Sequence, residues 1–288
     1  MAASAGTPAR IGPAAASETR PSGGGRRDAR TQVQTRRSLL HVWTPSAAAN
    51  GRDVLLYPSL ARLAADFDAV TAVLLRCGYR VLAVDPLVVD SAVPGGFRIA
   101  DLVDDVVALL DRAGSATVDA IGHAFGSRVV RLLSIRNPER VRSIVCLACG
   151  GRVARPSEVT AALLDSFDLS LPDTERLDSI RIAFFAPDRD PAVWLDGWLP
   201  AIGAAEAAAS LRTPDSEYFL GGRQPMLIVQ GADDVTAPPE NAALLRAGRT
   251  ARGDHTTLAQ LSAAGHALLP ERPGAIARAV RHFLAVPR

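Results

Sequence analysis

Short apolar runs alternate with amphipathic stripes along most of the chain, and this alternation restricts the fold more than any other feature. Runs typical of buried strands lie at residues 39–43, 53–59, 79–85, 116–122, 141–148, 225–231 and 255–262. Between them, apolar residues recur at helical spacing, as in Ile99, Leu102, Val103, Val106 and Leu110. Strands that alternate with helices in this way predict an α/β fold, with a mostly parallel central sheet covered by helices on both faces.

The alternation breaks between residues 152 and 221, where helical stripes continue but no strong strand run appears. We therefore predict one domain over residues 38–288, with residues 152–221 inserted as a helical lid. The lid is expected at the carboxyl edge of the sheet, where α/β folds bind ligands. One apolar helical face is predicted from the spacing of Trp194, Leu195, Trp198 and Leu199. Since that face either packs on the core or roofs a pocket, Trp194 and Trp198 are candidate substrate-binding residues.

Residues 1–37 have a different composition from the rest of the chain. They are rich in Ala, Gly, Ser, Pro and Arg, and they contain almost no large apolar side chains. Such a segment buries too little surface to offset the entropy of ordering it, so we predict a disordered basic tail. The stretch Thr35–Leu40 resembles a twin-arginine export signal, but the apolar segment after it is too short. The expected location is therefore the cytoplasm.

Overall composition excludes several classes of function. The net charge is +2, which indicates neither a nucleic-acid nor a membrane partner, and no apolar run reaches the length of a membrane span. The sequence contains no lysine, so a lysine Schiff base is excluded. The three cysteines are Cys77, Cys146 and Cys149, and we predict them to be buried rather than redox-active or metal-binding. No spacing of histidines or carboxylates indicates a metal site.

The stretch Gly122–Ser127, GHAFGS, lies between a predicted strand and a predicted helix. A strand, a sharp turn and a helix, with glycines on both sides of the central residue, form a nucleophile elbow. The central residue here is Ala124, where a serine is expected. Together with two later loops, this stretch resembles the α/β-hydrolase family. Ser59, Arg62 and Ala124 also match a subset of hydrolase-like sequences with P-S-x-x-R and G-H-A-F-G motifs.

The resemblance implies further site residues. The loop GADDVTAPPENA resembles the family's acid loop and places Asp234 as the acid, and AAGHALLPERP resembles the histidine loop and places His266. The order elbow, acid, histidine is the order of the family. The backbone N–H groups of Ser59 and Phe125 fall at the family's two oxyanion positions. Tyr57, in the turn before Ser59, is a further candidate for substrate binding.

Ala124 has no nucleophilic atom, so a physiological acyl-serine route is excluded. Four alternatives remain open to the sequence. His266 and Asp234 form a general-base dyad, which we favour; Ser59 supplies a hydroxyl from the opposite wall; Ser127 does so from one helical turn below; or Cys149 acts as a thiol. The remaining alternative is a protein without catalysis.

The sequence therefore predicts an α/β-hydrolase-fold enzyme that acts on a small apolar substrate without a cofactor, through His266 and Asp234. Two rival interpretations are kept. One is a non-catalytic pseudo-hydrolase that binds a small apolar ligand, and the other is a conventional esterase whose serine has been replaced by Ala124. The expected partner is a small-molecule substrate, and the sequence leaves the oligomeric state open.

Overall fold

An eight-stranded sheet forms the centre of the protein in the computed structural model, which describes residues 29–35, 37–46, 48–87 and 96–286. The spatial order of its strands is β1-β2-β4-β3-β5-β6-β7-β8. β1 and β2 pair antiparallel and β2 pairs antiparallel with β4, whereas all later pairs are parallel. The strands are β1 (Ala29–Gln34), β2 (Ser38–Thr44), β3 (Asp53–Tyr57), β4 (Arg80–Pro86), β5 (Val118–His123), β6 (Val141–Leu147), β7 (Met226–Gly231) and β8 (Thr256–Leu261).

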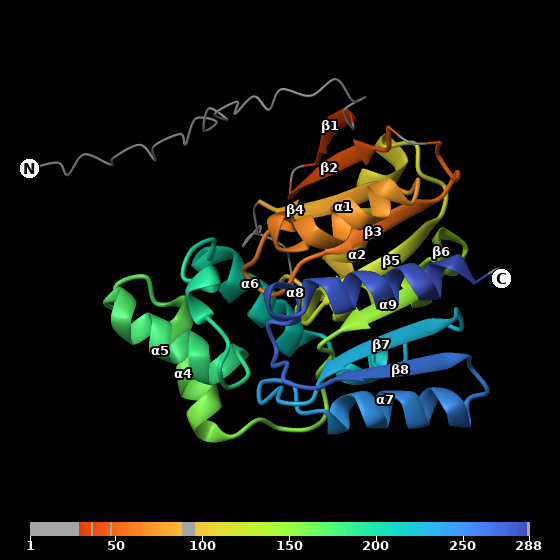
Figure 1. Cartoon of the computed structure of the whole chain (residues 1–288). Coiled ribbons are helices and arrows are strands. Elements are labelled where there is room, and N and C mark those ends of the chain that lie inside the picture. The colour runs from red at the N-terminus through yellow and green to blue at the C-terminus, as the bar shows by residue number, and fades with distance from the viewer. Residues whose placement is uncertain (1–28, 36, 47, 88–95, 287–288) are drawn as a thin grey trace, which may run out of the picture.

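Helices cover both faces of the sheet, as predicted (Figure 1). α1 (Asp68–Arg76) and α9 (Pro273–Ala285) pack on one face. The opposite face carries α2 (Ile99–Arg112), α3 (Phe125–Arg136) and α7 (Glu240–Ala251). On β3, Val54 and Leu56 enter the first core and Leu55 enters the second, because successive strand side chains point to opposite faces. Both cores are fully buried, which explains why the strands read as continuous apolar runs.

The first strand lies within the segment that we predicted to be a disordered tail, so that part of the prediction is wrong. Residues 29–34 form β1, although composition placed them in a disordered segment; residues 1–28 lie outside the described residues. β1 pairs with β2 over its whole length at the edge of the sheet. There the backbone groups that face β2 are satisfied by the ladder, and its polar side chains stay in solvent. Arg30 lies 2.6 Å from His41 Nδ1 and over the ring of Trp43, contacts that a compositional argument does not detect.

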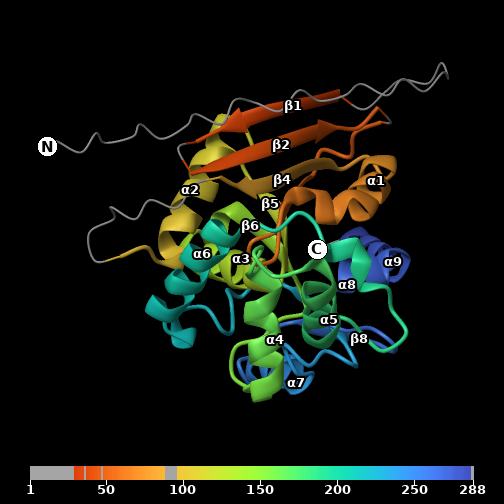
Figure 2. The same cartoon turned by 90° about the vertical axis from the view of Figure 1, so that its left-hand side faces the viewer.

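Between β6 and β7 the chain forms α4 (Ser157–Phe167), α5 (Asp173–Phe184) and α6 (Pro200–Arg212). These inserted helices extend beyond the carboxyl end of the sheet (Figures 1 and 2). Apolar side chains of α4, α5 and the segment after α5 form a third core cluster with Ala61 and Ala267 from the main domain, whereas Ala209 of α6 joins the core that contains α2 and α3. Within the described ranges, no helix is long and apolar enough to cross a membrane.

The predicted helical face through Trp194 and Trp198 is wrong. A 3-10 turn, Pro191–Trp194, ends at the first tryptophan, and α6 begins only at Pro200. Between them Gly197 has a φ angle of +81°, which is incompatible with a continuing helix. The two indoles still meet, with ring centroids 5.7 Å apart, because the irregular turn folds them together.

Candidate active site

The turn between β5 and α3 has the geometry of the predicted elbow. Ala124 has a φ angle of +48°, in the left-handed region where non-glycine residues are uncommon. Its N–H donates to the carbonyl of Leu147 on β6 at 2.8 Å, which ties the turn to the sheet. The strained turn points the Ala124 side chain away from the helix axis, into the space above the sheet edge.

Two glycines allow this turn to form. A Cβ on Gly122 would lie 2.3 Å from the backbone of Gly126, and a Cβ on Gly126 would lie 2.3 Å from the carbonyl oxygen of Tyr57. Both approaches are to backbone atoms that cannot move aside. The glycines are therefore required for α3 to start this close to β3 and β5.

The predicted acid and histidine lie in contact. His266 Nδ1 is 3.0 Å from Asp234 Oδ2 and 3.1 Å from Oδ1, and both residues are buried. The carboxylate also accepts hydrogen bonds from Gln230 Nε2 at 2.8 Å and from the N–H of Ala237 at 2.7 Å. An ionised carboxylate only accepts, so His266 Nδ1 carries the proton and Nε2 is left with a lone pair.

The histidine loop is fixed to the end of α5. Glu271 accepts from the N–H of Gly265 at 2.8 Å and from the N–H of Ala186 at 2.7 Å. Burial raises the pKa of Glu271, while these two N–H donors act in the opposite direction. The N–H of Ala267 donates to the carbonyl of Phe184 at 2.8 Å. The position of His266 is thus coupled to the inserted helices.

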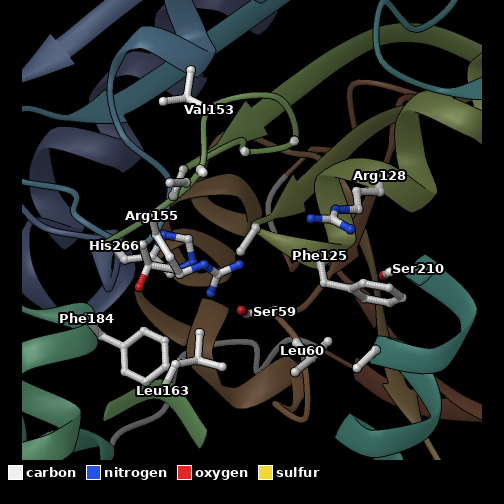
Figure 3. A pocket seen from close by; sticks show the side chains of 18 of the residues that line it. Ser59, Leu60, Phe125, Arg128, Val153, Arg155, Leu163, Phe184, Ser210 and His266 are labelled. Carbon is white, nitrogen blue, oxygen red and sulfur yellow. The ribbon is translucent and has the colours of Figure 1, made fainter. Parts of the chain in front are cut away.

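A cavity of about 590 Å³ lies between the carboxyl ends of the strands and the inserted helices (Figure 3). It is lined by residues that follow β3, β5, β6 and β7 and by residues of α4 and α6. Ser59, Ala124, Phe125 and His266 all face it. Phe125 opens α3, so its N–H has no acceptor within the helix. The cavity therefore brings together residues of three segments that are distant in sequence.

The candidate hydroxyl and thiol groups occupy different places. The Ser59 hydroxyl points into the cavity (Figure 3), but among the described residues it forms no hydrogen bond to His266. Ser127 lies beneath the elbow, where its Oγ donates to the carbonyl of Gly122 at 2.8 Å. Cys149 is fully buried, and burial raises the pKa of its thiol to about 12. The last two groups are not presented to a ligand.

A family model described as alpha/beta hydrolase fold matches residues 66–186. Solved structures superpose on nearly the whole chain. A hydrolase from Pseudomonas aeruginosa PA01 covers 89% of this chain and 98% of its own, with a TM-score of 0.68 and 20% identity. The chain is an α/β-hydrolase-fold protein. At this identity, the superposition shows the fold alone.

Two relatives of this α/β-hydrolase-fold protein are named for different activities. "Putative carbamate hydrolase RutD" of Variovorax paradoxus is 34% identical over 125 residues, which are 41% of this chain and 47% of the relative. This chain thus aligns with about half of that relative. "Putative non-heme bromoperoxidase BpoC" of Mycobacterium tuberculosis is 27% identical over 231 residues, which are 73% of this chain and 85% of the relative. The crystal structure of BpoC superposes with a TM-score of 0.67 at 20% identity and covers 90% of this chain and 96% of its own.

Two of the predicted substrate-binding residues do not line the cavity of this α/β-hydrolase-fold protein. Tyr57 is 0% exposed, because its strand position directs the ring into the core beside Phe125. Trp194 lies behind the wall, where its ring contacts His123 and Phe184. Trp198 does line the cavity. The two errors share a cause, since the sequence does not show which side of a wall a large side chain occupies.

His123 packs locally, as predicted. Its Nε2–H donates to the carbonyl of His266 at 2.9 Å, and burial lowers its pKa to about 4, with the neighbouring His266 acting in the same direction. The ring is therefore neutral near pH 7. Its hydrogen bond links the end of β5 to the histidine loop.

Three charged residues at the site were not predicted from the sequence. Arg128 and Arg155 line the cavity, and Glu206 of α6 is buried behind it. A signal existed for Arg128, which lies four residues after Ala124 and thus on the same side of α3. Arg155 lies in the loop after β6 and Glu206 in an alanine-rich helix, where no spacing distinguishes them from surface charges. Among the described residues, no group of three His, Cys, Asp or Glu side chains is placed to bind a metal ion.

Proposed function

We propose that this protein is a hydrolase in which His266, oriented by Asp234, acts as a general base on water. The observation that carries this proposal is the contact between His266 Nδ1 and Asp234 in the wall of a cavity that also holds Ala124. The hydrogen bond fixes the tautomer that leaves Nε2 as the proton acceptor, and the carboxylate stabilises the imidazolium that forms. Both functions are independent of a serine.

The proposed reaction uses the space that a serine would fill. A water molecule beside Ala124 transfers a proton to His266 Nε2 as its oxygen attacks the carbonyl carbon of the substrate. The oxyanion that develops faces the N–H groups of Ser59 and Phe125. The imidazolium then returns the proton to the leaving group, and the dyad regains its starting state.

The alternatives to water receive less support from the geometry. Ser59 faces the cavity without a hydrogen bond to the base, so nothing in the described contacts activates it. Ser127 and Cys149 are buried away from the cavity. A water activated by the dyad is therefore the nucleophile we favour.

The substrate is proposed to have an apolar body. Leu60, Leu163, Phe167, Phe184 and Trp198 contribute apolar side chains to the cavity. Residues 152–221 are proposed to act as a lid, since α4 supplies Leu163 and Phe167 and α5 supplies Phe184. Of the two named relatives, RutD is the one that supports hydrolysis.

Turnover of a panel of short esters and carbamates tests the proposal. His266→Ala and Asp234→Asn should each lower kcat by about 10²–10⁴-fold, the usual contribution of a positioned general base. Asp233→Asn is the matched control, because Asp233 is the exposed neighbour of Asp234. It should leave turnover within about twofold, as expected for a surface substitution.

The rival interpretation, a binding protein, rests on Ala124. It predicts that the natural protein binds members of the panel but converts none of them. Binding without turnover in the natural protein, or equal turnover in His266→Ala, contradicts the proposed enzyme.

A further inference from the structure

Two guanidinium groups point into the cavity from different elements. Arg128 belongs to α3, one helical turn after Ala124, and Arg155 belongs to the loop after β6. Figure 3 shows both guanidiniums directed towards the space that the Ser59 hydroxyl and His266 imidazole also face. Both side chains are partly shielded from solvent.

Neither group has a carboxylate within ion-pair distance in the described part of the chain. Arg128 and Arg155 form no ion pair and no hydrogen bond there, and the Arg128 guanidinium lies over the ring of Tyr218, 5.8 Å from its centroid. By contrast, Arg152 at the same rim is 2.6 Å from Asp215 and lies over the ring of Phe219. No aspartate or glutamate is among the residues that line the cavity.

This arrangement is unfavourable without an anion. Desolvation lowers the pKa of both arginines. The positive charge of Arg128 lowers the pKa of Arg155 further, while the carboxylate of Asp234 acts in the opposite direction. A guanidinium stays protonated in proteins, so the repulsion is not relieved by loss of a proton. Buried or half-buried cations normally pair with an acceptor. An anion between the two groups would remove the repulsion and satisfy their donors.

We propose that Arg128 and Arg155 bind a negatively charged oxygen group, a carboxylate or a phosphate, at one end of the substrate. This inference deepens the proposed hydrolase, on which it rests only for the statement that the ligand is a substrate. The fork of a guanidinium matches the two oxygens of such a group. The apolar side chains opposite the arginines take the rest of the molecule, so the ligand is amphiphilic rather than wholly apolar.

The position of Arg128 also limits the length of the substrate. One helical turn, about 5.4 Å, separates it from Ala124 along α3. This spacing favours substrates in which the bond that His266 and its water attack lies within a few bonds of the charged group. Short acids with an ester, amide or carbamate near the carboxylate fit this spacing.

Binding of stable probes to the full chain tests the inference without reference to turnover. Hexanoate and hexylphosphonate carry the two candidate head groups, and pentyl methyl ketone is a neutral analogue of hexanoate. Calorimetry should show binding of at least one anion that is stronger than binding of the ketone and is weakened by added salt. The tighter of the two anions identifies the head group.

Substitutions then locate the effect. Arg128→Gln and Arg155→Gln should each weaken anion binding about 10- to 100-fold, as expected for loss of a hydrogen bond to a charged group, and leave ketone binding unchanged. Arg152→Gln is the matched control, since its guanidinium is already paired with Asp215. Circular dichroism verifies folding, and Arg155, which lies in a loop, provides a test that does not alter α3.

Three results overturn the inference: equal binding of anion and ketone, no binding of either anion, or equal losses in Arg152→Gln and in the two test variants. The last would show that general positive charge attracts the anion. Anion binding and ester turnover, both measured on the natural protein, separate this inference from the proposed function. If the natural protein binds the anions but turns over no ester, the arginine site stands and the hydrolase is rejected. If it turns over esters but binds anions no better than the ketone, the hydrolase stands and the arginine site is rejected.

Discussion

The backbone N–H of Ala61 donates to Glu206 Oε2 at 2.8 Å, and this contact joins the loop after β3 to helix α6. Ala61 has a φ angle of +58°, so the loop that carries Ser59 is held in a strained conformation. Glu206 is 0% exposed, and its other oxygen has no partner among the described residues. Burial raises its pKa to about 8, against the effect of the Ala61 hydrogen bond.

This pKa predicts a stability that falls with pH. In the unfolded chain Glu206 titrates near 4.5, whereas in the folded protein it holds its proton up to about pH 8. Between these values the unfolded state binds fewer protons, so the free energy of unfolding decreases as pH rises and levels off above pH 8. The loss is on the order of 5 kcal/mol at most. Glu206→Gln keeps an acceptor for Ala61 but does not titrate, so its urea-unfolding profile should decline less between those limits.

Glu175→Gln is the control for this experiment, because Glu175 is exposed in the first turn of α5. It should follow the profile of the natural protein. Parallel profiles for Glu206→Gln and the natural protein would show that Glu206 ionises normally in the fold.

The elbow predicts a large difference between two glycine substitutions. Gly126→Ala places a Cβ 2.3 Å from the carbonyl oxygen of Tyr57 and 2.5 Å from that of Pro58, so α3 must move. Overpacking of this kind costs about 1–3 kcal/mol or more. Gly274→Ala, at the start of α9, meets only the mobile end of Arg278 at 3.5 Å and should be neutral or slightly stabilising. Chemical denaturation measures both, and equal stabilities would contradict the close packing.

Ala124→Ser should restore a nucleophile. The backbone of the elbow sets the direction of the side chain, so a serine there would enter the cavity beside His266. We expect p-nitrophenyl acetate to add one acetyl group to this variant, detected by mass spectrometry, and none at this position in the natural protein.

The double variant Ala124→Ser with His266→Ala is the control for acylation, since it removes the base. A folded Ala124→Ser variant that is not acylated would show that the elbow and the histidine are misaligned. Sustained ester turnover, rather than a single acylation, would favour the interpretation that Ala124 stands in place of a serine.

The cysteines should differ in reactivity. Cys146 and Cys149 are buried, and burial raises the pKa of both thiols, whereas Cys77 is partly exposed at the end of α1. Iodoacetamide at neutral pH should therefore label Cys77 first in the folded protein, because the thiolate is the reactive form. Peptide mapping identifies the site. Early labelling of Cys149 would favour the alternative in which its thiol is the reactive group at the candidate site.

Local sequence determined the layers of the fold and the order of the site motifs. Residues 54–57 and 144–148 are apolar at every position because parallel strands are covered on both faces. The glycines on both sides of Ala124 indicated the elbow, since a Cβ at either position would collide with the backbone of a neighbouring segment. The contact between Asp234 and His266 followed from motif order, because the loops after parallel strands meet at one edge of the sheet.

Only the tertiary structure decided which side chains face the cavity. Tyr57 points into the core and Trp194 lies behind the wall, whereas Arg128 and Arg155 converge on the cavity from two elements. β1 likewise forms because its backbone pairs with that of β2. The periodicity of a sequence records the burial of residues against their own neighbours in the chain. Strand pairing and the convergence of charges depend on distances between separate segments, and these distances are fixed only when the segments pack.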